Sequence, residues 1–145
     1  MTVTVCVAVS VTDELVSTFA RLIPQLSRSN PPPDAAELQG LIDHEACHVL
    51  MARDDATGEW IGTTTLVVFP IPTAVRAWIE DVVVDEATRG SGAGAALTNF
   101  AVELARSLGA KTVDLTSRPS REAANRLYQR LGFELRETNC YRFDL

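Results

Sequence analysis

A glycine-rich turn between a predicted strand and a predicted helix is the feature of this 145-residue sequence with the clearest chemistry. Residues 81–94 have the sequence DVVVDEATRGSGAG. A turn that leads from a strand into a helix aims backbone N–H groups and the positive end of the helix dipole at one point, which suits phosphate oxygens. Gly90, Gly92 and Gly94 carry no side chain that would keep a phosphate away from the backbone. The pattern therefore predicts an anion site.

Two other interpretations of this turn compete with an anion site. The first is a tight turn that binds no ligand. The second is a dinucleotide site, because Gly90, Gly92 and Ala95 fit the looser form of that fingerprint and Asp114 follows about twenty residues later. A dinucleotide fold needs two wound halves or a separate substrate domain, and the sequence predicts one strand-helix-strand unit. A nucleoside triphosphate loop is excluded because no Gly-Lys-Ser/Thr follows.

The residues of the turn resemble a known family. Val84, Arg89, Gly92 and Gly94 are similar to the acyl-CoA signature of the GNAT superfamily, a strand Val followed by Arg or Gln, two residues, Gly, one residue, and Gly or Ala. Further along, ANRLYQRLGF at residues 124–133 resembles the second element of the family, in which Tyr follows Asn by three residues and Gly-Phe comes next. The resemblance implies an N-acetyltransferase that moves an acetyl group from acetyl-CoA to a primary amine.

The resemblance also implies roles for the residues around the turn. The CoA pyrophosphate would be bound by backbone N–H groups of the turn, which consists of Arg89, Gly90, Ser91, Gly92, Ala93 and Gly94. Asn125 would form a hydrogen bond with the pantetheine arm. The arm would also pair, as another strand does, with the backbone of Val82, Val83 and Val84. A backbone N–H of this strand can also polarise the thioester carbonyl and stabilise the oxyanion. Acetyl-CoA would be a co-substrate, and no metal is implied.

Acetyl transfer to an amine needs a group that removes a proton, because a free alkylamine is mostly protonated at neutral pH. Glu80 and Asp81 lie just before the three valines, and side chains alternate along a strand, so at most one of the two carboxylates points straight into a given site. We favour Glu80 as the base, because it shares the parity of Val82 and Val84 and because IEDVVV resembles the polyamine and glucosamine-phosphate branches of the family. Asp81 would then bind or orient a cationic substrate. A water relay and a structural role for either carboxylate stay open.

Tyr128 is the predicted general acid. It lies one helical turn after Asn125, so both side chains occupy the same face of the predicted helix. A phenol with a pKa of about 10 can protonate a thiolate with a pKa of about 8.5 only if the transfer is coupled to bond breaking. The position of this Tyr in the family permits that coupling, and a core aromatic is the alternative.

A second motif points to a different chemistry. His44, Glu45 and His48 spell HExxH, which in a helix would place two imidazoles on one face for zinc, with the Glu as general base. The motif, however, starts near the end of a short predicted helix, and CHVLMAR at residues 47–53 has the pattern of a strand. We therefore set the zinc hydrolase hypothesis aside and expect no metal centre.

The elements of the first half must support the strand at residues 77–84. Alternating valines predict a first strand within residues 1–11, and Thr12 opens a helix that Pro24 should kink or end. Asp34 and Glu37 form a capping-box pattern for a short second helix. Strands are then expected over 47–53, 60–69 and 77–84, the first two joined by a hairpin loop at 54–59.

The second half alternates strands and helices. A helix is predicted from about residue 94 to 108 with Gly109 past its end, followed by a strand over 111–117. Ser120 should cap a helix that ends before Gly132, and residues 133–145 should supply one or two closing strands. The whole chain, 1–145, is thus expected to be one α/β domain of mixed α+β type. The resemblance implies a GNAT-like sheet that is mostly antiparallel, splayed at the acyl-CoA site and flanked by about four helices.

Composition limits the partners. A net charge of −6 and a pI near 4.8 argue against nucleic acid and weakly favour a cationic acceptor. No apolar run approaches the length of about 18 residues that spans a bilayer, so we expect no membrane insertion. Cys6, Cys47 and Cys140 show no paired spacing, which favours free thiols and the cytoplasm. A homodimer stays open. A non-catalytic acyl-CoA sensor is the alternative function, and the joint presence of Glu80 and Tyr128 argues against it.

Overall fold

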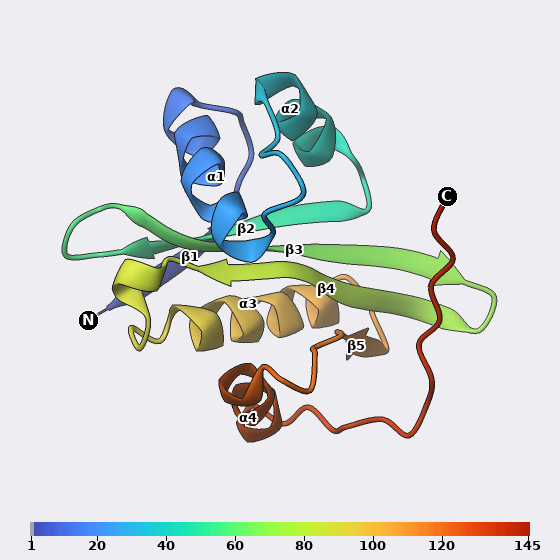
Figure 1. The fold of residues 1–145 in the computed structure, drawn as a ribbon. Coiled ribbons are helices and arrows are strands. Elements are labelled where there is room, and N and C mark those ends of the chain that lie inside the picture. Colours follow the sequence, from blue (N-terminus) through green and yellow to red (C-terminus); the bar gives the residue numbers. More distant parts are fainter. Residues whose placement is uncertain (1) are drawn as a thin grey trace.

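Five strands form one sheet in the order β1-β2-β3-β4-β5, in a computed structural model that describes residues 2–145 (Figure 1). Met1, which the predicted domain and first strand segment include, lies outside the described residues. The elements are β1 Val3–Val7, α1 Asp13–Leu26, α2 Ala35–Asp43, β2 Cys47–Asp54, β3 Trp60–Ile71, β4 Ala74–Val84, η1 Glu86–Thr88, α3 Ala93–Ser107, β5 Thr112–Asp114 and α4 Glu122–Arg130. None of the helices described between residues 2 and 145 is long and apolar enough to cross a membrane.

The sheet is mostly antiparallel, as predicted. β1 to β4 pair with their neighbours in antiparallel fashion, and β5 pairs with β4 in parallel. The parallel pairing is short, because it joins Arg76, Ala77 and Trp78 of β4 to the three residues of β5. The remainder of β4, from Ile79 to Val84, therefore has β3 on one side and no strand of the described chain on the other.

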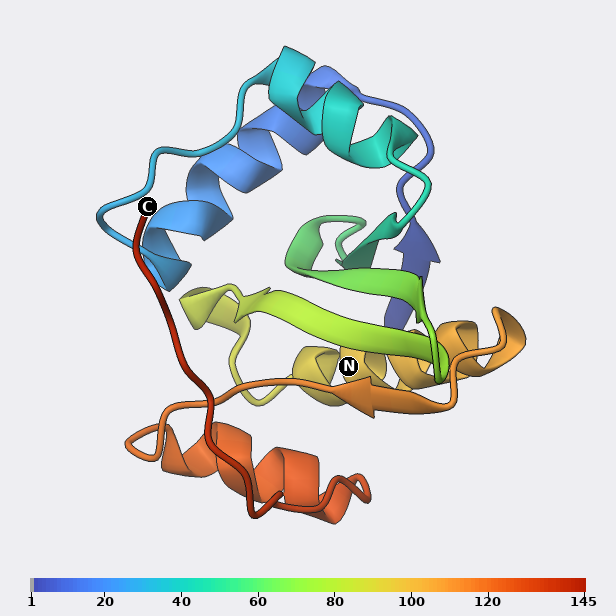
Figure 2. The same cartoon turned by 90° about the vertical axis from the view of Figure 1, so that its right-hand side faces the viewer.

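Helices cover both faces of the sheet. α1 and α2 lie on one face, and α3 and α4 lie on the other (Figures 1 and 2). One buried cluster joins α3 to the sheet, with Leu50, Leu66, Ile79 and Leu97 at its centre. The opposite cluster joins α1 and α2 to the sheet and includes Val49 and Met51. Successive β2 residues thus alternate between the two clusters, the period expected of a strand buried on both faces.

Local signals explain where the first two helices begin. The Thr12 hydroxyl accepts a hydrogen bond from the Leu15 amide at 3.1 Å and so caps α1. Asp34 and Glu37 form the predicted capping box at the start of α2. Pro24 neither ends α1 nor stops its last turn, because the helix continues to Leu26. Pro24 removes the N–H that would bond the Ala20 carbonyl, and the helix continues for only two residues after it.

Two predictions for the C-terminal part are wrong. Ser120 does not cap α4, since the N-cap is Arg121, which has no side-chain cap and whose amide closes a turn onto the Arg118 carbonyl at 3.0 Å. Residues 133–145 form no strand. After α4 this segment rises past the end of the sheet without reaching the edge of β5, so its backbone has no strand to pair with (Figures 1 and 2). Its large apolar side chains stay exposed, namely Leu135, Tyr141, Phe143 and Leu145.

Candidate active site

The glycine-rich turn connects the end of β4 to the start of α3, as predicted. The Asp85 side chain accepts a hydrogen bond from the Ala87 amide at 3.1 Å and caps the short helix η1. Gly90 and Gly92 then adopt positive φ angles of 82° and 87°, a conformation that favours glycine. A Cβ atom added at either position would meet no heavy atom within 4 Å. The two glycines therefore give the turn its shape and leave open space above its backbone.

Part of the backbone of this turn is available for a ligand. The Ser91 amide donates to the Thr88 carbonyl at 3.1 Å, and the Ala93 amide donates to the Ser91 hydroxyl at 3.3 Å. Among residues 2–145, no hydrogen-bond acceptor is found for the amides of Gly92, Gly94 and Ala95. These groups lie at the first turn of α3, where the helix dipole favours an anion.

Gly94 serves packing in addition to its place in the turn. A Cβ atom at Gly94 would lie 3.3 Å from Leu127 Cδ2 and 3.9 Å from Val84 Cγ2. The sequence predicts that this glycine lets a phosphate approach, but a side chain here would meet α4 first. The contact brings three parts of the predicted site together: the end of β4, the start of α3 and the middle of α4.

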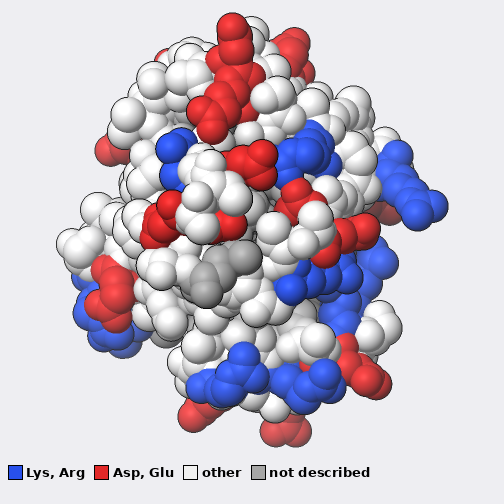
Figure 3. All heavy atoms as spheres, turned by 90° about the vertical axis from the view of Figure 1, so that its left-hand side faces the viewer, with Lys and Arg blue, Asp and Glu red and all other residues white. Residues whose placement is uncertain are grey.

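Electrostatics around the turn are mixed. The Arg89 side chain is 70% exposed, and its Nη2 lies 3.9 Å from Glu86 Oε1. Figure 3 shows acidic and basic side chains interspersed over the side of the molecule that lies at the left in Figure 1, where the turn is. The net charge of −6 is therefore not spread as a uniform acidic surface, and it is a poor guide to the potential at the site.

A β-bulge interrupts β4 at the predicted base. Glu80 pairs with Thr65 and Val83 pairs with Thr63, so Asp81 and Val82 face the single residue Thr64. Asp81 has a φ of 53°, the one positive value at a non-glycine residue in the described chain. The Thr64 hydroxyl donates to the Glu80 carbonyl at 2.8 Å and ties the bulge to β3.

The bulge changes which face of β4 Glu80 occupies, which was predicted to be the face of Val82 and Val84. Val82 and Val84 pack in the cluster on the α3 face together with Ile79, whereas Glu80, next to Ile79, points to the face that α1 and α2 cover. The extra residue shifts the alternation by one, so Glu80 does not share a face with Val82 and Val84. Any role of Glu80 must depend on its place beside the open edge of β4.

Glu80 titrates above the ordinary range of a glutamate. Partial burial raises the pKa of its carboxyl group most, the neighbouring Asp81 raises it further, and Arg142 in the C-terminal segment lowers it. Glu80 and Asp81 are both exposed residues. A carboxylate with a raised pKa is a better proton acceptor than an ordinary glutamate, which suits a general base.

Tyr128 lies on α4 and is 7% exposed. Its ring packs edge-on against Phe133, with 5.9 Å between the ring centroids. Burial raises the pKa of the Tyr128 phenol, and Arg121 lowers it. The phenol is protonated at neutral pH, and because the raised pKa makes it a weaker acid, its proton transfer to a thiolate must be coupled to C–S bond breaking.

Asn125 has a partner within the chain. Its Nδ2 donates to the Arg118 carbonyl at 3.0 Å and so holds the loop between β5 and α4. The amide group that the resemblance assigns to the pantetheine arm is thus used in part for the loop. This interaction was not predicted, because an amide in the middle of a helix gives no sign of a partner seven residues earlier.

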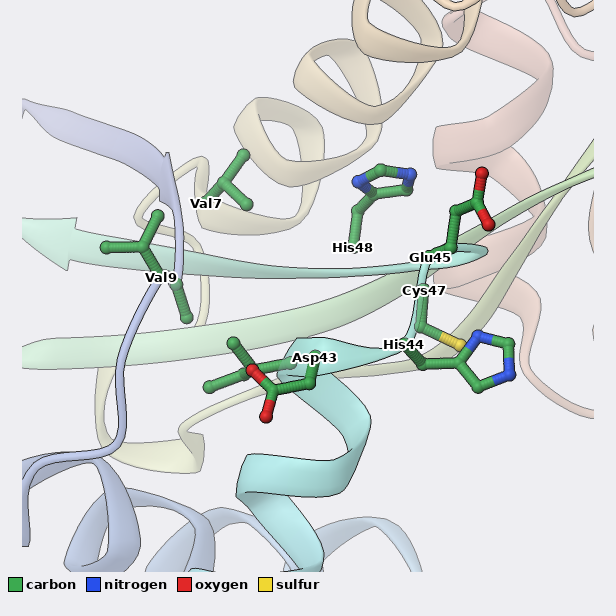
Figure 4. A pocket seen from close by; sticks show the side chains of 9 residues that line it. Val7, Val9, Asp43, His44, Glu45, Cys47 and His48 are labelled. Atoms are coloured by element: carbon green, nitrogen blue, oxygen red, sulfur yellow. The ribbon is translucent and has the colours of Figure 1, made fainter.

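The HExxH residues are not arranged as in a zinc hydrolase. His44 is the C-cap of α2, and His48 lies in β2, so the two imidazoles do not share a helix face. His44 Nδ1 accepts a hydrogen bond from the Ala46 amide at 3.1 Å. Figure 4 shows His44 and His48 pointing in different directions around a shallow pocket between β1, β2 and the end of α2. Within residues 2–145 no group of three or more His, Cys, Asp or Glu residues is suited to hold a metal ion.

Comparisons with known proteins agree with this arrangement. The model of the Acetyltransferase (GNAT) family matches residues 12–133. A glucosamine 6-phosphate N-acetyltransferase from Trypanosoma brucei brucei is 32% identical over 136 residues, which are 90% of this chain and 89% of the relative. The crystal structure of an acetyltransferase from Trypanosoma brucei superposes with a TM-score of 0.79 at 29% identity, over 99% of this chain and 100% of the other. A glucosamine-6-phosphate N-acetyltransferase from Arabidopsis thaliana shares the fold, with a TM-score of 0.79 at 16% identity over 99% of each chain.

Proposed function

The chain belongs to the Acetyltransferase (GNAT) family, and we propose that it transfers an acetyl group from acetyl-CoA to the primary amine of a small acceptor or a peptide. The observation that carries the proposal is the open edge of β4 next to the glycine-rich turn. An extended pantetheine arm can pair with such an edge in the way an added strand does, while free amides at the start of α3 receive the pyrophosphate. Cofactor and acceptor are thereby held at one strand.

The arrangement supports a transfer with a base and an acid on opposite faces of the sheet. Glu80 faces the α1 and α2 side, and Tyr128 lies on the α4 side. We propose that Glu80 accepts the proton from the amine as the C–N bond forms, directly or through a water. Tyr128 donates its proton to the thiolate sulfur as the C–S bond breaks. A backbone N–H near the bulge, at Val82 or Val83, would stabilise the oxyanion between the two events.

We propose that the acceptor binds at the bulge with its amine in the protonated, cationic form. Glu80 and Asp81 are adjacent, exposed carboxylates at the bulge, and an ammonium group is attracted to them before it loses its proton. Polyamines, aminoglycosides, amino acids and peptides offer such amines. The name of the Trypanosoma brucei brucei relative adds an amino sugar phosphate to the panel. The test is CoA release from acetyl-CoA with each amine class, and a preference for anionic acceptors would contradict the cationic acceptor while sparing the acetyl-CoA reaction.

The role of Glu80 predicts a pH-dependent defect. Glu80→Gln should lower kcat by about 10²-fold at neutral pH, and the loss should shrink at high pH because the free amine is then already abundant. Kinetics of the wild type and the variant between neutral and alkaline pH measure this trend. Glu103→Gln, an exposed carboxylate on α3, is the matched control and should leave kcat unchanged. A defect of the same size at every pH would remove Glu80 as the base.

Asp81 should affect substrate binding and the titration of Glu80. Asp81→Asn is expected to raise KM for the acceptor with a smaller effect on kcat, the mark of lost uniform binding. Because Asp81 raises the pKa of Glu80, the variant should also keep its activity to lower pH than the wild type.

Arg142 lowers the pKa of Glu80, so Arg142→Gln should raise that pKa and move the acid limb of the pH profile to higher pH. Identical, pH-independent losses in the Glu80 and Asp81 variants would contradict this division of roles.

A further inference from the structure

Two side chains of α1 hold the point where β4 leads into the glycine-rich turn. Arg21 forms an ion pair with Asp85, and its Nη2 donates to the Trp60 carbonyl at 2.7 Å. Gln25 Oε1 accepts a hydrogen bond from the Glu86 amide at 2.8 Å, and its Nε2 lies 3.5 Å from Asp85 Oδ1. Arg21 and Gln25 are four residues apart, so they lie on one face of α1 and contact the same segment.

Asp85 is the residue on which these contacts meet. Its side chain is 13% exposed, and its amide continues the pairing with β3 by donating to the Ile61 carbonyl at 2.8 Å. Its carbonyl accepts hydrogen bonds from the amide and the hydroxyl of Thr88 at 2.9 and 3.1 Å. Asp85 thus fixes the end of the sheet on one side and the path of η1 on the other. The turn that would bind the pyrophosphate starts directly after η1.

The turn needs such an external support. Gly90 and Gly92 give it backbone freedom, and the N-cap residue of α3, Gly92, has no side chain that could cap the helix. A loop that is ordered before its ligand arrives loses less conformational entropy on binding, so its affinity is higher. The Arg21–Asp85 pair is charge-assisted, and one partner is largely buried, which makes the pair less sensitive to screening than an exposed one.

We propose that Arg21 and Gln25 are positioning residues: through Asp85 they hold the glycine-rich turn in the conformation that binds the CoA pyrophosphate. The same contacts link the order of α1 to the binding of a ligand at the turn. The proposal rests on the proposed function in that the ligand is acetyl-CoA. It gives a role in acetyl-CoA binding to helix α1, which packs on the face of the sheet to which Glu80, the proposed base, points. By linkage, a ligand that orders the turn should also order the C-terminal half of α1.

Kinetics with acetyl-CoA as the varied substrate test the positioning role. Arg21→Met and Asp85→Asn should each raise KM for acetyl-CoA by about tenfold, with kcat and KM for the acceptor changed by less than about twofold. The double variant should be no worse than the single ones, because both remove the same contact. Arg106→Met, which removes an exposed ion pair on α3, is the matched control and should behave as the wild type. If Arg21→Met does not fold, Arg21→Lys tests the same contact with the charge retained.

Hydrogen exchange distinguishes positioning from general stability. In the wild type, saturating acetyl-CoA should slow hydrogen exchange at amides of the turn and at amides of residues 20–26 in α1. In Arg21→Met, acetyl-CoA should still protect the turn but should no longer protect α1. Variants with a lower melting temperature but an unchanged KM for acetyl-CoA would overturn this proposal alone. A wild type that does not bind acetyl-CoA would overturn the proposed function, and this inference with it.

Discussion

Tyr128→Phe is expected to lower kcat by about 10²-fold to 10⁴-fold and to leave KM for acetyl-CoA nearly unchanged. The substitution removes one hydroxyl group and keeps the ring, whose edge packs against Phe133. Packing in α4 and the fold should therefore be retained. The lost group is the proposed proton donor to the leaving thiolate, and the phenol carries this proton at neutral pH. Steady-state kinetics with a saturating acceptor measure the effect.

The chain offers a matched control for this experiment. Tyr141 is the second of its two tyrosines and is 87% exposed. Tyr141→Phe therefore removes an exposed hydroxyl, which accepts a hydrogen bond from the Asn139 side chain at 3.4 Å. It should keep full activity. Melting temperatures of both variants should lie close to that of the wild type. Full activity in Tyr128→Phe would reduce Tyr128 to a core aromatic and would leave the thiolate to take its proton from water.

Gly92→Asp should abolish the binding of acetyl-CoA. In the wild type, acetyl-CoA should raise the melting temperature, because a ligand held only by the native turn stabilises the folded state by mass action. The aspartate places a negative charge at the first turn of α3, where the pyrophosphate would lie. The expected result is the loss of the thermal shift at all concentrations that saturate the wild type. A shift of unchanged size would remove the turn from the acetyl-CoA site.

Backbone strain must be separated from charge in this experiment. Gly92 has a φ of 87°, so any side chain there is strained, and Gly92→Asn imposes a similar strain without the charge. Gly109, just past the other end of α3, has a φ of 84° and equally open surroundings. Gly109→Asp should therefore lower the melting temperature by a comparable amount and keep the full thermal shift with acetyl-CoA. Gly92→Asn should retain more of the shift than Gly92→Asp.

Elements with local signals were predictable from the sequence. Thr12 and the pair Asp34 and Glu37 mark helix starts through contacts within three residues, and both are confirmed. The glycines at 90 and 92 mark a turn because few other residues adopt a positive φ, and this is confirmed too. In each case the signal and the structure that it specifies lie within a few residues. Family membership was predictable for the same reason, since its two motifs are short and contiguous.

Features that depend on distant pairing were not predictable. The bulge at Asp81 arises from the register of β4 on β3, and the alternation of residues 80–84 alone gives no sign of it. The contact of Arg21 with Asp85 joins residues 64 positions apart, and neither residue has a distinctive neighbourhood in the sequence. The alternating apolar residues 141, 143 and 145 have the pattern of a strand, but a strand also needs an edge to pair with.

The most direct test of acetyl transfer is the mass of the product formed from deuterated acetyl-CoA and the acceptor that gives the fastest CoA release. We expect one labelled acetyl group on the primary amine of the acceptor, formed in equal amount with free CoA and almost absent with Tyr128→Phe. Acetyl-CoA that binds and raises the melting temperature, but yields no labelled amine with any acceptor class, would contradict this expectation.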